Sequence, residues 1–160
     1  MILEYRPIEL NDNTKLANII RSAIVALKLP IEGTAHSDPS TDNLFQLFQK
    51  TNSFYWVALG DNKVLGGCGI YPSNGLPEGC CEIVRFFLTP EARGKGIGKT
   101  LLDMSIEKAK VLGYQSLYLE SFPDMQDAIR IYEQNGFTYL TSALGNTGHY
   151  ACNTWMLKEL

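Results

Sequence analysis

Between residues 81 and 139 the sequence alternates between strand-like apolar runs and helix-like patterns. The run CCEIVRFFL predicts a buried strand, and residues 97–112 repeat apolar side chains at the spacing of an amphipathic helix. The run YQSLYLES predicts the next strand, and residues 124–134 predict a second helix that ends at an Asn-Gly pair. Because a strand, a helix and another strand in succession favour parallel pairing of the two strands, part of the sheet should be parallel.

The first half of the chain predicts a different arrangement. The run ILEYRPI predicts a strand, and residues 11–29 carry apolar side chains at helical spacing. Two strand-like runs, SFYWVALG and VLGGCGIY, are joined by Asp61-Asn62, which favours an antiparallel hairpin. The sheet should therefore be mixed. The chain has 160 residues, which are enough for a single domain spanning residues 1–160 around one core.

A glycine-rich turn lies between the predicted strand and helix, where a helix N-terminus can bind phosphate. A nucleoside-triphosphate loop of the form G-x-x-x-x-G-K-[ST] requires glycine at the position of Arg93. A dinucleotide fingerprint, G-x-G-x-x-G, requires glycine at the position of Lys99 or Leu101. The pattern that fits is R-x-x-G-x-G, formed by Arg93, Gly96 and Gly98.

A second pattern, Ala128-x-x-x-Tyr132-x-x-x-Gly136-Phe137, follows this turn. Together with the strand CEIVRFFL and the turn, it resembles the GNAT superfamily of acyl-CoA-dependent N-acetyltransferases. The resemblance covers residues 81–137, about a third of the chain. It implies a single-domain α/β fold with a mixed, mostly antiparallel sheet, a splayed parallel strand pair and helices on both faces. It also implies acetyl-CoA as the co-substrate, without a metal.

The pyrophosphate of coenzyme A needs several hydrogen-bond donors that converge on its oxygens. Backbone amides from Gly94 to Lys99 would supply them at a helix start, where the helix dipole also favours an anion. The resemblance adds that the pantetheine arm binds backbone groups at the end of the preceding strand, and that Met125 replaces an asparagine that contacts this arm in many relatives. The predicted cofactor-binding residues are Phe87, Leu88, Thr89, Arg93, Gly94, Lys95, Gly96, Ile97, Gly98 and Lys99. The alternative, a solvated surface turn, explains the glycines but not their place between a strand and a helix.

Acetyl transfer to an amine requires both a base and an acid. An alkylammonium (pKa ~10) must lose a proton before it attacks, and a thiolate (pKa ~8.5) leaves better when protonated. The resemblance places the acid at Tyr132, for which a core aromatic is the alternative. It places the base at Glu82, and strand parity puts Glu82 on the face of Val84 and Phe86, where burial would raise its pKa. A surface carboxylate, an ion pair with Arg85 and an ordered water chain as the base are the alternatives.

The acceptor pocket has no motif of its own, and three residues are candidates for binding the substrate. His36, in GTAHSDP, lies in a predicted loop, where solvation explains it equally well. His149, in GNTGHY, follows glycines that allow the backbone to bend at a pocket rim, although simple packing would also explain it. Arg85 would pair a substrate carboxylate or neutralise Glu82 or Glu120.

Composition narrows the class of partner. The net charge of −3 and the lack of a basic run give no support to a nucleic-acid partner, and we expect a small primary amine in preference to a protein amine. No apolar stretch is long enough to span a bilayer, and the N-terminus lacks a signal-peptide pattern. The cysteines form no Cys-x-x-Cys pair and predict buried thiols in a reducing cytoplasm: Cys68, Cys80, Cys81 and Cys152.

We therefore expect a cytoplasmic enzyme without a metal or a membrane partner, and the sequence leaves a homodimer open. Two other classes compete with it. One is a non-catalytic acyl-CoA-binding regulatory module, which intact Glu82 and Tyr132 disfavour. The other is a phosphotransferase with a degenerate phosphate loop, which Arg93 disfavours.

Overall fold

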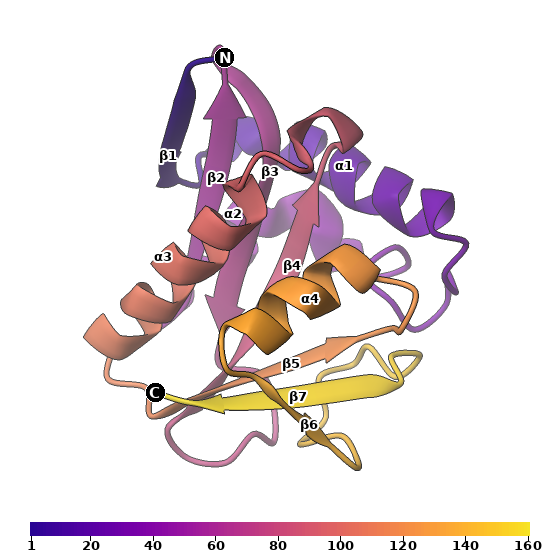
Figure 1. Cartoon of the computed structure of the whole chain (residues 1–160), viewed down its shortest axis with the longest axis vertical. Coiled ribbons are helices and arrows are strands. Elements are labelled where there is room, and N and C mark those ends of the chain that lie inside the picture. Colours follow the sequence, from indigo (N-terminus) through magenta and orange to yellow (C-terminus); the bar gives the residue numbers. More distant parts are fainter.

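The computed structural model describes residues 1–160 and contains a seven-stranded sheet in the order β1-β2-β3-β4-β5-β7-β6 (Figure 1). The strands are β1 (Leu3–Pro7), β2 (Phe54–Gly60), β3 (Lys63–Tyr71), β4 (Cys80–Leu88), β5 (Ser116–Ser121), β6 (Thr138–Leu140) and β7 (Thr154–Glu159). Every neighbouring pair is antiparallel except β4 and β5. These two pair only where Cys80–Glu82 meets Ser116–Tyr118, and beyond Glu82 the strands separate. The predicted mixed sheet with a splayed parallel pair is confirmed.

Helices cover both faces of the sheet, as the sequence predicts (Figure 1). They are α1 (Asn13–Ala26), α2 (Leu44–Leu47), α3 (Ile97–Val111) and α4 (Gln126–Gln134), with 3-10 turns η1 (Leu10–Asp12), η2 (Pro39–Asn43) and η3 (Pro90–Ala92). Side chains of α1 and α2 pack on one face, and those of α3 and α4 pack on the other. The helix predicted at residues 11–29 is shorter because the chain turns out of it at Lys28, which adopts a left-handed conformation. No helix in the chain is long and apolar enough to cross a membrane.

A β-bulge in β4 changes which side chains face the site. Arg85 has a φ of 52°, and Gly69 pairs with Val84 while Gly67 pairs with Phe87. An extra residue in β4 therefore opposes the partner strand, and side-chain parity shifts after Arg85. The expected shared face of Glu82, Val84 and Phe86 is thus wrong for Phe86, which turns into the core under α3 and α4.

Candidate active site

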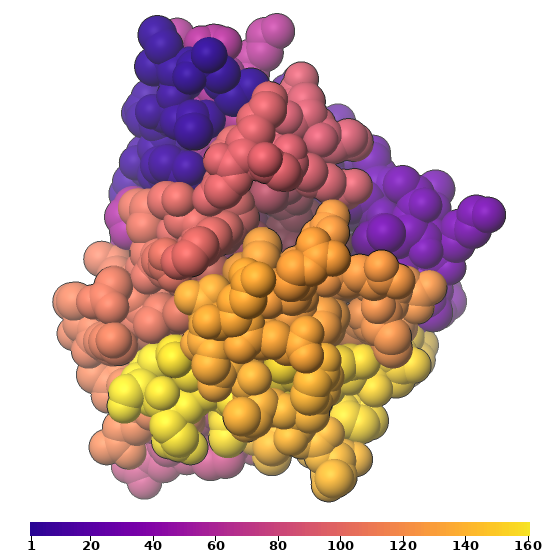
Figure 2. All heavy atoms as spheres, in the orientation of Figure 1, coloured from indigo at the N-terminus to yellow at the C-terminus, as the bar shows by residue number.

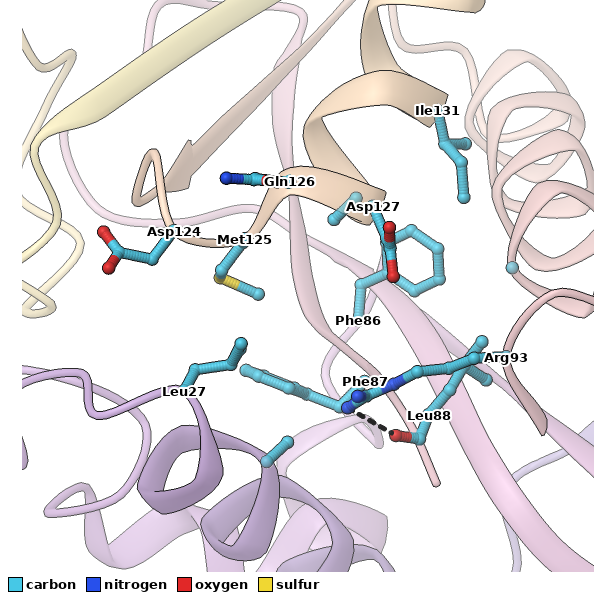
Figure 3. A pocket seen from close by; sticks show the side chains of 13 residues that line it. Leu27, Phe86, Phe87, Leu88, Arg93, Asp124, Met125, Gln126, Asp127 and Ile131 are labelled. Carbon is cyan, nitrogen blue, oxygen red and sulfur yellow. Dashed lines mark hydrogen bonds between the residues drawn. The ribbon is translucent and has the colours of Figure 1, made fainter. Parts of the chain in front are cut away.

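A cavity of about 250 Å³ opens between the end of β4 and the start of α4 (Figure 3). We call it the cofactor cavity; it is lined by Ala23 of α1, Leu27 just beyond that helix, residues 86–88 of β4, Arg93, Gly98, residues 124–128 and Ile131. Figure 2 shows the recess between α4 and the segment that follows β4. The Arg93 guanidinium reaches back to the carbonyl oxygen of Leu88 at 3.5 Å, at the mouth of this cavity (Figure 3).

The glycine-rich turn presents free amide groups beside the cofactor cavity. No amide of residues 94–99 donates a hydrogen bond within the chain, and the first that does is Thr100, to the Gly96 carbonyl oxygen at 3.1 Å. Gly94 and Gly96 have φ values of 72° and 76°, and a Cβ atom at either would meet nothing within 4 Å. These glycines therefore serve the left-handed backbone and not the avoidance of a clash. The turn is a concentrated set of unpaired donors at the start of α3.

The predicted cofactor residues divide by how they can contribute. Ile97 is fully buried, and its side chain packs in the core, so only its backbone faces the turn. Lys95 is exposed, whereas the Lys99 ammonium lies 2.6 Å from the carboxylate of Asp103. The Thr89 amide is already bonded to Leu65, and its buried hydroxyl has no partner.

A smaller cavity of about 70 Å³ lies deeper between β4 and β5, and we call it the inner cavity. It shares Phe86, Phe87 and Met125 with the cofactor cavity, so the two adjoin. Its ionisable or nucleophilic side chains are Glu82, Arg85, Glu120, Tyr132, His149 and Cys152. Residues predicted for both catalytic roles therefore meet next to the expected path of the cofactor.

Glu82 lies in this inner cavity with its side chain almost fully buried. Burial raises the pKa of the Glu82 carboxyl to about 8; a hydrogen bond from the Ser73 hydroxyl at 2.5 Å lowers it, and the charge of Glu120 raises it. A carboxyl with this pKa holds its proton and releases it close to neutral pH. The expectation of a buried carboxylate on β4 agrees with this geometry.

Glu120 is a site residue that the sequence did not single out. Its carboxylate accepts hydrogen bonds from the hydroxyls of Tyr118, at 2.6 Å, and Thr147. The parallel register places Tyr118 opposite Glu82, and Glu120 lies two residues further along the same face of β5. A parallel pairing of these two strands in this register would have been the signal for Glu120, because it puts both glutamates on the same face of the sheet.

Tyr132 has the surroundings of a core aromatic and also reaches the inner cavity. Its ring packs against Phe86 and Phe137 with centroid separations of 6.0 Å and 5.6 Å, as a core aromatic would. Its side chain also lines the inner cavity. Burial raises the pKa of the Tyr132 hydroxyl well above its ordinary value, so the group stays protonated at neutral pH. Met125, at the start of α4, lines both cavities, and its sulfur lies 3.4 Å from the Ser121 hydroxyl.

Arg85 does not pair with Glu82 or Glu120, contrary to one expectation. Its buried guanidinium lies 2.9 Å from the carboxylate of Asp38 and also donates to the hydroxyls of Ser40 and Thr41. The bulge explains this direction, because the left-handed backbone at Arg85 turns the side chain toward the loop before α2. Asp38 lies in that loop and belongs to no motif, so nothing in the sequence distinguishes it from other loop aspartates.

The two histidines occupy different surroundings. His149 lines the inner cavity and a neighbouring outer cavity of about 190 Å³, which contains Ser73, Lys50 and Asn146. Its Nε2 lies 2.8 Å from Asp38 Oδ2, while burial and the charge of Arg85 lower its pKa. His36 is half-buried and lines neither cavity. The structure thus brings His149, but not His36, to the other candidates. No group of three or more His, Cys, Asp or Glu residues is arranged to hold a metal ion.

Residues 21–137 match the acetyltransferase (GNAT) family, and the chain belongs to that family. An uncharacterized N-acetyltransferase of Escherichia coli K12, YjgM, is 36% identical over 156 residues, which are 97% of this chain and 93% of the relative.

Two solved structures show the same fold. A GNAT-family acetyltransferase from Staphylococcus aureus Mu50 superposes with a TM-score of 0.83 at 18% identity, covering 99% of each chain. A phosphinothricin acetyltransferase from Sinorhizobium meliloti, crystallised with acetyl-CoA, gives a TM-score of 0.79 at 20% identity and covers 100% of this chain and 89% of its own. The resemblance in the sequence is confirmed at the level of family and fold.

Proposed function

We propose that this chain transfers the acetyl group of acetyl-CoA directly to the primary amine of a small molecule, within a ternary complex. The observation that supports this most strongly is the position of Glu82. This carboxyl, with a pKa of about 8, lines a cavity that adjoins the inner end of the cofactor cavity. This position supports Glu82 as the base, because an acceptor amine that reached the thioester would pass beside it.

The cofactor would lie along the splayed edge of β4. Its pyrophosphate would accept hydrogen bonds from the free amides of residues 94–99, with Arg93 and Lys95 adding positive charge. The pantetheine arm would follow Phe87 and Leu88, whose strand has no partner on the β5 side. This course ends at Phe86 and Met125, the residues that both cavities share.

In the reaction, Glu82 takes a proton from the bound alkylammonium, and the free amine attacks the thioester carbonyl carbon. The new C–N bond forms a tetrahedral intermediate, which collapses with cleavage of the C–S bond. The departing sulfur receives a proton from the Tyr132 hydroxyl, and the nitrogen loses its second proton, which restores the tyrosine through solvent. The products are an N-acetylated amine, free coenzyme A and one proton, released when Glu82 deprotonates.

A direct transfer also agrees with the state of the one thiol in the inner cavity. Burial raises the pKa of the Cys152 thiol to about 12, with smaller contributions from Glu120 and Glu82. A thiol rather than a thiolate is a poor nucleophile, so an acetylated cysteine intermediate has no support here.

A thermal-shift series with acetyl-CoA, coenzyme A, ATP and NAD tests the cofactor first. A ligand at ~100 times its Kd adds about 2.7 kcal/mol to the free energy of unfolding. A primary-amine panel then follows, with free thiol release and the mass of the product as readouts. Stabilisation by acetyl-CoA with N-acetylation of an amine is expected. Binding without transfer to any amine would indicate a regulatory module, and stabilisation by ATP or NAD alone would overturn the proposal. The cytoplasmic location and the homodimer stay predictions of the sequence.

A further inference from the structure

The inner cavity has one basic side chain, and that cation is already neutralised. Arg85 is the only lysine or arginine that lines it, and Asp38 lies 2.9 Å from the guanidinium. Both side chains are largely withdrawn from water, with relative exposures of 6% for Arg85 and 28% for Asp38. A buried guanidinium paired this closely does not offer its charge to a second anion.

The Nη groups of Arg85 are held by side chains of the same loop. Its Nη1 donates to the Thr41 hydroxyl at 3.3 Å, and Nη2 donates to the Ser40 hydroxyl at 3.2 Å in addition to Asp38. Its Nε is buried and has no partner. The guanidinium charge is therefore directed toward Asp38, and both N–H groups of Nη2 are occupied.

The other charged groups around the acceptor position are acidic or neutral. Glu82 and Glu120 line the same cavity, and the charge of Glu120 adds to the burial that raises the pKa of Glu82. His149 Nε2 lies 2.8 Å from Asp38 Oδ2 and 3.4 Å from Arg85 Nη2, so this ring contacts the same ion pair. The neighbouring outer cavity contains one further cation, the exposed Lys50.

We infer that the acceptor is a primary amine that carries no carboxylate on the carbon next to its amino group. This rests on the proposed acetyl transfer. An ammonium group finds the carboxyl oxygens of Glu82 and Glu120, which line the inner cavity. A carboxylate beside it would enter the same space, where the only guanidinium is already paired with Asp38, and would face two glutamates.

Matched pairs of acceptors test this acceptor class with the wild-type protein. Histamine and histidine, tyramine and tyrosine, and cadaverine and lysine each differ by one carboxylate. We expect kcat/KM to be higher for the carboxylate-free member by at least about tenfold. A preference for the amino acids, or transfer to the amino acids alone, would overturn the acceptor class. Absence of acetyl-CoA binding, or binding without transfer to any amine, would instead overturn the proposed function.

The variant Asp38→Asn tests the cause of the preference. It keeps the shape of the side chain and removes the charge that neutralises Arg85, so the preference for the carboxylate-free amine should fall by about tenfold. Asp42→Asn is the matched control. Asp42 lies in η2, the turn that follows Asp38, and pairs with Arg21 of α1, but it lines neither the inner nor the outer cavity. An equal preference in all three proteins would overturn the role of Asp38.

If Asp38→Asn fails to fold, Glu120→Gln gives a second measurement. This variant leaves the pair of Arg85 and Asp38 intact and removes one negative charge from the inner cavity. The ratio of kcat/KM between the carboxylate-free amine and its amino acid should fall, as in Asp38→Asn. An unchanged ratio would contradict the inference.

Discussion

The two halves of the proposed site differ in the chemical groups that they present to a ligand. The cofactor half presents backbone amides of residues 94–99, which belong to one short segment and depend on glycine conformations. The acceptor half presents ionisable side chains from four different segments, of which Glu82 is buried and Asp38, Glu120 and His149 are half-buried. Backbone donors tolerate changes of most side chains around them, whereas each buried ionisable group sets the charge of its neighbours. Substitutions should therefore separate the two halves cleanly.

The largest difference between the effect on kcat and the effect on cofactor affinity should come from Glu82→Gln. The amide cannot take a proton from the ammonium, so kcat at pH ~8 should fall by about 10²-fold or more, within the range of a lost general base. The Kd of acetyl-CoA should stay unchanged, because Glu82 lies outside the cofactor cavity. Steady-state kinetics and calorimetric titration measure the two quantities.

The pH profile provides the control for this variant. Because Glu82 must be ionised to act, kcat of the wild type should rise tenfold per pH unit up to the pKa of about 8 and then level off. In Glu82→Gln this rise should disappear. A profile that is identical in both proteins would assign the base to another group, such as His149 or a water chain.

A smaller loss is expected from Tyr132→Phe. The ring would keep its packing between Phe86 and Phe137, so the affinity for acetyl-CoA should hardly change. Loss of the proton donor should lower kcat by about 10²-fold. Tyr114→Phe is the control, because the Tyr114 hydroxyl bonds to the Asn52 carbonyl away from the cavities. An unchanged rate in the first variant would remove Tyr132 from the mechanism.

Gly96→Val should show the opposite pattern, because this substitution in the cofactor half should change the affinity for the cofactor. A left-handed backbone costs a side-chain-bearing residue about 1–2 kcal/mol, so the turn should relax and the affinity for coenzyme A should fall about tenfold. Gly113→Val is the matched control, since Gly113 has a φ of 91° and equally open surroundings beyond the end of α3. Equal affinities in the two variants would show that the turn does not bind the cofactor.

The same contrast explains which parts of the site could be predicted from the sequence. The turn at residues 93–98 is local, so its pattern, its strand and its helix were all visible in one stretch. Asp38 and Glu120 join the site only through a loop contact and a strand register, and neither has a motif. The bulge at Arg85 reversed the parity of Phe86, because one extra residue in a strand shifts every later side chain to the other face.

The smallest effect tests the contact between two loops on the acceptor side. Gly145 has a φ of 63°, and a Cβ atom there would lie 2.6 Å from the carbonyl oxygen of Asn74, whereas a Cβ atom at Gly148 would meet nothing within 4 Å. Both Gly145→Ala and Gly148→Ala introduce backbone strain, but only the first also forces the loops apart. Gly145→Ala should therefore be less stable by about 1–3 kcal/mol than its control, or ~2–10 °C in Tm. It should raise the KM of the acceptor and leave that of acetyl-CoA unchanged. Equal melting temperatures would mean that this close approach does not hold the acceptor half together.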